Sequence, residues 1–244
     1  MNFTEKETYT MEDLLDIMAL LRSPQGCPWD RKQTHQTIRN NLLEETYEAV
    51  EAIDTDDPEL LREELGDVLF QVVFHSRMEE EKGGFRFEDV VDGIAKKLIR
   101  RHPHVFGDGA AQNCEEVLSN WEAIKKKEKG RSTDTEVLRG VSRALPALMR
   151  AQKVCGKAAK AEKKRPSLSE ALGSLVECAK QITAVPGQQK VQRDSLGRLL
   201  LLAAEISEIL NMEAEQALTE ACDRFILQFE KREKQAAGKN FESV

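Results

Sequence analysis

Apolar residues recur every three or four positions along most of this chain, and this spacing is typical of one face of an α-helix. The first such run lies between Thr10 and Ser23. Thr10 is a typical N-cap residue, and the carboxylate of Asp13 three positions later can complete a capping box. A segment that contains proline and glycine, 23–28, ends the run. The pattern predicts a helix here and an all-α fold for the whole chain.

Turn residues divide the rest of the chain into further helices. Asp57 and Pro58 form an N-cap and N1 pair that opens a long helix, and Gly83 and Gly84 end it. A loop is predicted at 186–189, and the last ten residues are expected to fray. The helices predicted after the first span about residues 34–53, 58–82, 87–101, 115–129, 137–161, 169–184, 195–210 and 214–234.

A domain boundary is predicted in the segment Gly-Arg-Ser-Thr-Asp at residues 130–134. This segment separates a basic helix end from a new run of periodic apolar residues. We therefore predict one domain over residues 1–130 and a second over residues 131–244.

A weak internal repeat relates the two predicted domains. The string REELGDVL at 62–69 recurs as RDSLGRLL at 193–200. The second copy has Ser195 where the first has Glu64, and Arg198 where the first has Asp67. At the earlier cluster Glu177-Cys178 is matched with Glu48-Ala49, and Gly173 and Ser174 then stand in place of Glu44 and Glu45. We expect the second domain to fold like the first without binding a cation.

The composition limits the fold class, the partners and the cellular compartment that can be expected. A hydrophobic share of 40% is sufficient for a packed core, and only 5% aromatic residues favours helices over sheets. The net charge of −7 argues against a general nucleic-acid binder. The five cysteines have no Cys-x-x-Cys spacing, and neither a secretory leader nor a bilayer-spanning apolar run is evident. We expect a cytoplasmic protein with no nucleic-acid or membrane partner.

Two acidic clusters are the main candidate for chemistry. Glu45 and Glu48 are three residues apart in one predicted helix, and Glu64 and Asp67 are three apart in the next. Residues at this spacing share a helix face, and a short turn makes consecutive helices antiparallel neighbours. Four carboxylates can therefore converge between the two helices.

Asp67 bears most directly on the nature of this cluster. Residues 65–74 carry one other strongly polar side chain, Gln71, so this helix is expected to be buried. A buried carboxylate is costly unless a cation neutralises it, and hard oxygen ligands suit Mg²⁺. Exposed salt bridges and a di-iron site are the alternatives. Di-iron bundles use Glu-x-x-His, whereas His75 lies eight residues after Asp67, which disfavours the di-iron alternative.

Several strings occur together in the first half of the chain. Glu44-Glu45-x-x-Glu48 is followed by Glu64-x-x-Asp67, and CPWD at 27–30, LEETYE at 43–48 and RRHPHVF at 100–106 surround them. Together they resemble the signature of the MazG family of all-α nucleoside triphosphate pyrophosphohydrolases. The resemblance is strong from about residue 11 to 129, and the repeat extends it weakly to about 235. It implies tandem MazG-like helical bundles, the second of them degenerate.

The resemblance implies Mg²⁺-dependent hydrolysis of a nucleoside triphosphate to the monophosphate and pyrophosphate, with deoxynucleotides and non-standard nucleotides among the candidate substrates. Water would attack the α-phosphorus, which requires a cation to neutralise phosphate charge and a carboxylate to accept a proton. Glu45, Glu48, Glu64 and Asp67 are the expected metal ligands. Glu44 is either the general base or a group that supports a metal ligand. Which nucleobase the substrate carries stays open. Removal of non-standard nucleotides is a role suggested by analogy alone.

Substrate contacts implied by the resemblance fall on two pairs of residues. Lys97 and Arg101 are four apart in one predicted helix, and Trp121 and Lys125 are four apart in another. The cationic side chains can bind phosphates, and the indole of Trp121 can stack on a nucleobase. The structural alternatives are that Lys97 and Arg101 form an ordinary basic helix end and that Trp121 belongs to the core. Weaker candidates are Trp29 and Lys32. The histidines at 35, 75, 102 and 104 are too dispersed to predict a metal site.

Members of the family are similar in forming dimers whose helices complete one another's bundles, so a homodimer is expected. The chief alternative function is non-catalytic: a helical dimer that senses nucleotides or binds a protein. The intact carboxylates of the first half favour the enzyme. The degenerate second half favours a binding or assembly role for that half.

Overall fold

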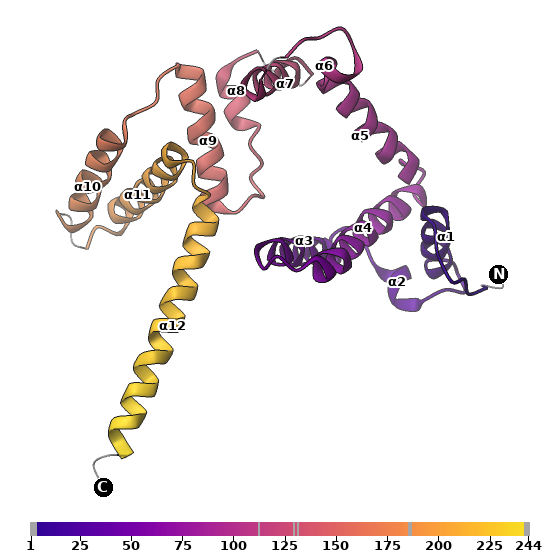
Figure 1. The fold of residues 1–244 in the computed structure, drawn as a ribbon, viewed down its shortest axis with the longest axis horizontal. Helices are drawn as coiled ribbons and strands as arrows, with labels where there is room; N and C mark the ends of the chain where they lie inside the picture. Colours follow the sequence, from indigo (N-terminus) through magenta and orange to yellow (C-terminus); the bar gives the residue numbers. More distant parts are fainter. Residues whose placement is uncertain (1–3, 112, 129, 131, 185–186, 242–244) are drawn as a thin grey trace. The chain divides into compact units, whose positions relative to one another are not determined.

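The computed structural model describes residues 4–111, 113–128, 130, 132–184 and 187–241 (Figure 1). Residues in these ranges form twelve helices and no strand, so the all-α prediction is confirmed. The chain divides into two compact units, Met1–Trp121 and Glu122–Val244.

Some sequence predictions fall on residues outside the described ranges. These are the end of a helix at Lys129, the position of Arg131 in the predicted linker, Pro186 in the predicted loop, and fraying at 242–244.

Six helices belong to the first unit, and a seventh reaches from it into the second. They are α1 (Met11–Leu21), α2 (Pro28–Lys32), α3 (Arg39–Asp54), α4 (Pro58–Glu80), α5 (Phe87–Arg101), α6 (Pro103–Phe106) and α7 (Cys114–Glu128). Both predicted N-caps are confirmed. Thr10 and Asp13 form a capping box at α1, and the Asp57 carboxylate accepts hydrogen bonds from the first backbone N–H groups of α4.

The core of this unit lies where α1 and the start of α3 pack against the C-terminal half of α4. Five side chains there are at most 2% exposed and form one cluster: Met18, Ile38, Val73, Phe74 and Met78. Because Ile38 directly precedes α3, burying its side chain holds the start of that helix against α4.

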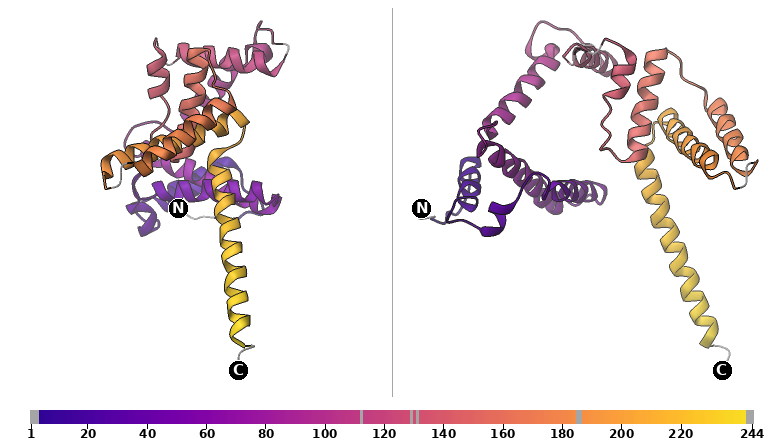
Figure 2. Two further views of the ribbon diagram at one scale, coloured as in Figure 1. Left: turned by 90° about the vertical axis from the view of Figure 1, so that its left-hand side faces the viewer. Right: turned by 180° about the vertical axis from the view of Figure 1, so that it is seen from behind.

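α3 and α4 form an antiparallel hairpin and lie side by side in Figures 1 and 2. Residues 55–57 connect them, as the sequence predicts. Asp56 in this turn has φ of 55°, in the left-handed region that aspartate tolerates better than most residues. The short turn places the two acidic helices next to each other.

The predicted helix over 34–53 begins only at Arg39. In place of a first helical turn, the Thr37 hydroxyl accepts a hydrogen bond from Thr34 N at 2.8 Å and donates one to Thr34 O at 3.0 Å. Such local bonds from threonine compete with helical backbone pairing. Residues 33–38 therefore form a turn that leads into α3.

Two short helices, α2 and α6, are absent from the sequence prediction. Each begins at a proline, Pro28 and Pro103, at positions where the pattern indicates helix ends. The prediction is wrong there because proline has a fixed φ near the helical value and lacks only a donor that the first turn leaves unpaired. The residue that stops one helix can open the next.

The second unit contains α8 (Asp134–Arg139), α9 (Ala147–Glu162), α10 (Leu168–Ala184), α11 (Gln189–Leu210) and α12 (Ala214–Phe241). α10 and α11 form a hairpin, and α9 packs along α11 (Figures 1 and 2). The buried Gln152 of α9 donates to Met212 O at 2.8 Å and accepts from Ala214 N at 2.9 Å. This side chain ties α9 to the connection between α11 and α12.

Three boundaries in the second unit differ from prediction. The single helix predicted over 137–161 is wrong, because Gly140 follows α8 and Pro146 precedes α9. α11 begins at Gln189 rather than 195, and α12 continues to Phe241 rather than 234, so 235–241 are helical where fraying is expected. In the described ranges no helix has both the length and the apolarity needed to cross a bilayer.

Candidate metal centre

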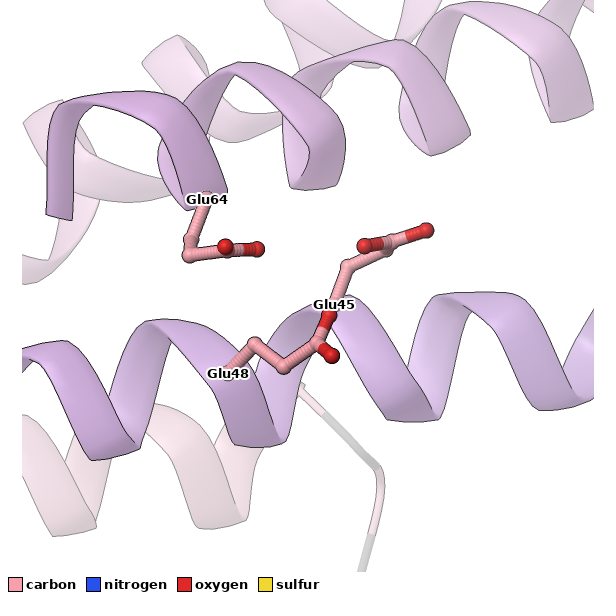
Figure 3. A group of neighbouring side chains, drawn as sticks. All are labelled: Glu45, Glu48 and Glu64. Carbon is pink, nitrogen blue, oxygen red and sulfur yellow. The ribbon is translucent and has the colours of Figure 1, made fainter. Parts of the chain in front are cut away.

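Three carboxylates of the hairpin gather between α3 and α4. Glu45 and Glu48 extend from α3, and Glu64 extends from α4 towards them (Figure 3). One oxygen of each can be chosen so that all three lie within 4.8 Å of one another. Because Glu45 and Glu48 are three residues apart, both can face α4 from one side of their helix. We call these three residues the carboxylate group.

Burial differs among the three side chains: Glu64 is 9% exposed, Glu45 is half-buried and Glu48 is exposed. Burial, followed by the charges of Glu48 and Asp67, raises the pKa of the Glu64 carboxyl above its ordinary value. The pKa of Glu45 is also raised, first by burial and then by Asp67 and Glu48. Like charges therefore repel one another within the group until protons or a cation neutralise them.

Asp67 is exposed and is not part of the carboxylate group. The prediction that Asp67 is buried is wrong for the single chain. Leu65 is 54% exposed as well, so α4 is open to solvent around Asp67, whereas Val73 and Phe74 further along the helix are buried. Asp67 is nevertheless one helical turn from Glu64, and its charge acts on both Glu45 and Glu64. It lies within electrostatic reach of the group.

The donor set fits a hard divalent cation. Every atom that converges is a carboxylate oxygen, the ligand type that Mg²⁺ prefers, and Mg²⁺ usually keeps several waters beside one or two carboxylates. Because Glu48 is exposed, water and a phosphate can approach the group from its side. Glu44 is exposed on α3, next to Glu45 and outside the group.

The second unit repeats the hairpin without repeating this group. Cys178 of α10 is buried like its counterpart Ala49 of α3, and its thiol donates to Ser195 O at 3.2 Å. Glu177, the counterpart of Glu48, pairs with Lys180 at 3.7 Å. Among the residues that the structure describes, no three ligand-type side chains of the second unit come within 4.8 Å of one another.

Two of the predicted substrate residues contact each other. The guanidinium carbon of Arg101, at the end of α5, lies 5.2 Å from the centroid of the Trp121 ring on α7. This is a cation–π contact, which the sequence does not predict.

The other candidates lie on separate elements. Lys97 is half-buried on α5, and Lys125 is half-buried on the part of α7 that belongs to the second unit. Trp29 is 58% exposed on α2, and Lys32 at the end of that helix is also exposed.

Two of the four histidines, which appear dispersed in the sequence, meet in the structure. His35 Nδ1 and His75 Nδ1 are 2.7 Å apart although forty residues separate them in the chain. No local sequence signal could have found this contact, because it depends on how the turn before α3 packs against α4.

Comparison with known proteins identifies the family to which the chain belongs. Residues 33–106, which include the whole of the acidic hairpin, match the MazG nucleotide pyrophosphohydrolase domain. The chain is 40% identical over 238 residues to the nucleoside triphosphate pyrophosphohydrolase of Escherichia coli (strain K12), covering 95% of this chain and 90% of that protein.

Similarity of the same kind is found in other bacteria. The chain is 38% identical over 222 residues to the nucleoside triphosphate pyrophosphohydrolase/pyrophosphatase MazG of Thermotoga maritima, covering 91% of this chain and 85% of that protein. A nucleoside triphosphate pyrophosphohydrolase of Mycobacterium tuberculosis is 41% identical over 153 residues, covering 62% of this chain and 46% of that protein. Since relatives match nearly the full length and the domain match contains the acidic hairpin, this chain belongs to the MazG family of nucleotide pyrophosphohydrolases.

Proposed function

We propose that this chain hydrolyses nucleoside triphosphates to the monophosphate and pyrophosphate, and that the reaction takes place at the α3–α4 hairpin. One observation carries the proposal: Glu45, Glu48 and Glu64 gather within 4.8 Å in the segment that matches the family's domain. Relatives that cover most of this chain bear the name nucleoside triphosphate pyrophosphohydrolase.

The carboxylate group and Asp67 are the proposed ligands of Mg²⁺. When bound, the cation neutralises phosphate charge and orients a water for attack on the α-phosphorus. Glu64 is buried, so its side chain has little freedom and fixes one ligand position. Glu48 is exposed and faces the side from which a triphosphate can approach.

The attacking water must lose a proton. Glu44 is the candidate acceptor because it is exposed next to Glu45 and lies outside the group proposed to bind the cation. The same position would let Glu44 hold a ligand carboxylate in place through hydrogen bonding, so both roles stay part of the proposal.

Substrate binding is assigned to cations and an indole beyond the hairpin. Lys97 and Arg101 are proposed to contact the phosphates, and Trp121 to stack on the base with Lys125 nearby. The contact between Arg101 and Trp121 supports this assignment, since it holds a guanidinium and an aromatic ring together. Stacking tolerates every base, so we propose a broad nucleotide range.

A homodimer is also part of the proposal. Leu43, Tyr47 and Val50 recur at helical spacing along α3, and they are 43%, 55% and 46% exposed in the single chain. Val91, Ile94 and Leu98 make a similar stripe on α5, each at least 45% exposed. Contiguous apolar stripes of this kind mark interaction surfaces. A second copy of the chain would cover them and complete the bundle around the hairpin.

The two halves are proposed to differ in role, with catalysis in residues 1–130 and a structural or assembly role for 131–244. Of the four proposed ligands, only Glu48 has a carboxylate counterpart in the second copy, and this is Glu177. Its pairing with Lys180 supports the division because that carboxylate already has a cationic partner. All five cysteines are free thiols, which supports a reducing, cytoplasmic setting.

The test is to incubate the full-length protein and its Glu48→Gln variant with a panel of nucleoside triphosphates and Mg²⁺, and to identify the products by chromatography. We expect monophosphate and pyrophosphate from the parent, no turnover in excess chelator, and a loss of about a hundredfold or more in the variant. Orthophosphate and diphosphate as first products would contradict the proposal. A parent that binds nucleotide with Mg²⁺ but releases no product would favour the non-catalytic helical dimer.

A further inference from the structure

Two histidines and a glutamate meet at the end of the hairpin opposite its turn. His35 Nδ1 is 2.7 Å from His75 Nδ1, and the two rings are parallel within 6°. His35 Nε2 is 2.5 Å from Glu79 Oε1. His35 belongs to the turn before α3, whereas His75 and Glu79 belong to α4. These contacts join the chain entering α3 to the neighbouring helix, and we call the three residues the histidine clasp.

The clasp can hold only a limited number of protons. An ionised Glu79 accepts, so His35 Nε2 carries a proton and donates it. Across the 2.7 Å contact, one Nδ1 must donate and the other must accept. If both imidazoles were fully protonated, two N–H groups would face each other and two positive charges would repel. The contact therefore requires at least one neutral ring.

The surroundings of the clasp favour the less protonated state of His75. Its Nε2 is buried and has no hydrogen-bond partner among the described residues. Burial, and then the neighbouring His35, lowers the pKa of His75 below the ordinary value of 6.5. The charged groups acting at the clasp are Glu79 and Lys82, whose Nζ lies 3.2 Å from the Glu79 carboxylate. Acidification below the ordinary histidine pKa thus works against the clasp.

The clasp and the turn hold the hairpin at its two ends, with the carboxylate group between them. Along α3 the group begins ten residues after His35, and along α4 Glu64 lies eleven residues before His75. A slip of α3 by one helical turn would move it by about 5.4 Å along its axis. That displacement exceeds the 4.8 Å within which the three carboxylates gather. A clasp that holds the axial register of α3 relative to α4 therefore also holds the three carboxylates together.

We propose that His35, His75 and Glu79 are positioning residues that keep α3 in register with α4, and that the divalent-cation affinity of the carboxylate group depends on this proton-sensitive contact. The inference rests on the proposed function for the identity of the cation site. The clasp itself rests on the contacts above, which are independent of any cation.

The test uses the full-length chain and Mn²⁺ as a paramagnetic probe, with binding measured by electron paramagnetic resonance. His35→Ala removes both contacts from a half-exposed position in the turn. His75→Asn removes titration but keeps a donor and an acceptor at the place of Nδ1. His104→Asn serves as the control, because His104 lies on α6, away from the clasp.

At pH 8 we expect His35→Ala to bind Mn²⁺ about tenfold or more weakly than the parent, by analogy with the loss of a residue that supports a ligand. His75→Asn and the control should stay within about threefold. Between pH 8 and pH 5.5 affinity should fall less in His75→Asn than in the parent. Parent-like Mn²⁺ binding by folded His35→Ala at pH 8, or equal pH dependence in His75→Asn and the parent, would overturn the proposal.

Hydrogen exchange separates failure of the clasp from failure of the proposed function. If the parent binds no Mn²⁺, the cation assignment is wrong, and the clasp is then judged by exchange of the α3 amides. Faster exchange of those amides in His35→Ala than in the parent would support the clasp. Unchanged protection along α3 would overturn it even in the absence of a cation site.

Discussion

Replacing Glu45 by glutamine should make the metal-free protein more stable and the enzyme much slower. The change removes one negative charge and keeps the shape of the side chain. Glu48 and Glu64 each have an oxygen within 4.8 Å of a Glu45 oxygen. At the dielectric of water, which is the lower limit for a group open to solvent at Glu48, a pair of unit charges at this separation repels by about 1 kcal/mol. Relief of two repulsions gives about 1–2 kcal/mol of added stability, or a rise in Tm of roughly 2–8 °C.

The pH dependence follows from the raised pKa of Glu45. A carboxyl whose pKa is higher in the folded state stabilises the fold below its ordinary pKa of 4.5, and that stabilisation is lost as pH rises through the folded value. The metal-free parent should therefore gain stability through this residue as the pH falls through the raised pKa towards 4.5. The variant should lack this gain. The comparison is clean because both chains share every other titrating group.

The assay combines thermal unfolding by circular dichroism in excess chelator with turnover in Mg²⁺. We expect kcat to fall by about a hundredfold or more, because a ligand that acts on charge in the transition state is lost. Asp54→Asn is the matched control, since Asp54 is exposed on the same helix, lies outside the carboxylate group and is not among the charges that raise the pKa of Glu45 or Glu64. A variant that melts lower than the metal-free parent and turns over at the parental rate would show that Glu45 neither repels its neighbours nor takes part in catalysis.

Three further predictions concern other residues. Asp67→Asn should lower turnover by about a hundredfold while the fold survives, and near-normal rates in a product assay would remove Asp67 from the ligand set. Glu177→Gln should leave turnover within about twofold, because its partner is a surface lysine; a collapse in a folded protein would give the second half a catalytic part. Gln152→Ala should destabilise the second unit by about 1–3 kcal/mol in urea unfolding, since the buried Ala214 N–H loses its acceptor; an unchanged midpoint would contradict this role.

Local features of the fold could be predicted because their causes lie within a few residues. The caps at Thr10 and Asp57 and the turn between α3 and α4 depend on side chains next to the backbone groups they satisfy. The same holds for the acidic pairs, whose spacing alone puts each pair on one helix face. The hairpin then brings three of the four carboxylates together.

Features that depend on distant packing could not be predicted. The apolar pattern around Asp67 indicates burial, yet in one chain the part of α4 around Leu65 and Asp67 is exposed. An apolar stripe does not reveal whether its partner is the same chain or another copy. The contact of His35 with His75 joins residues forty positions apart, and the break before α9 at Pro146 interrupts an otherwise helical period. In each case the observed structure depends on contacts that the local apolar pattern does not reveal.

The proposed reaction is attack of water on the α-phosphorus of a nucleoside triphosphate at the carboxylates of the α3–α4 hairpin. The most direct measurement is hydrolysis in ¹⁸O-labelled water with Mg²⁺, followed by mass spectrometry of both products. We predict ¹⁸O in the nucleoside monophosphate and unlabelled pyrophosphate, with no reaction in excess chelator. Label in the pyrophosphate, or release of labelled orthophosphate with a nucleoside diphosphate, would show that water attacks a different phosphorus.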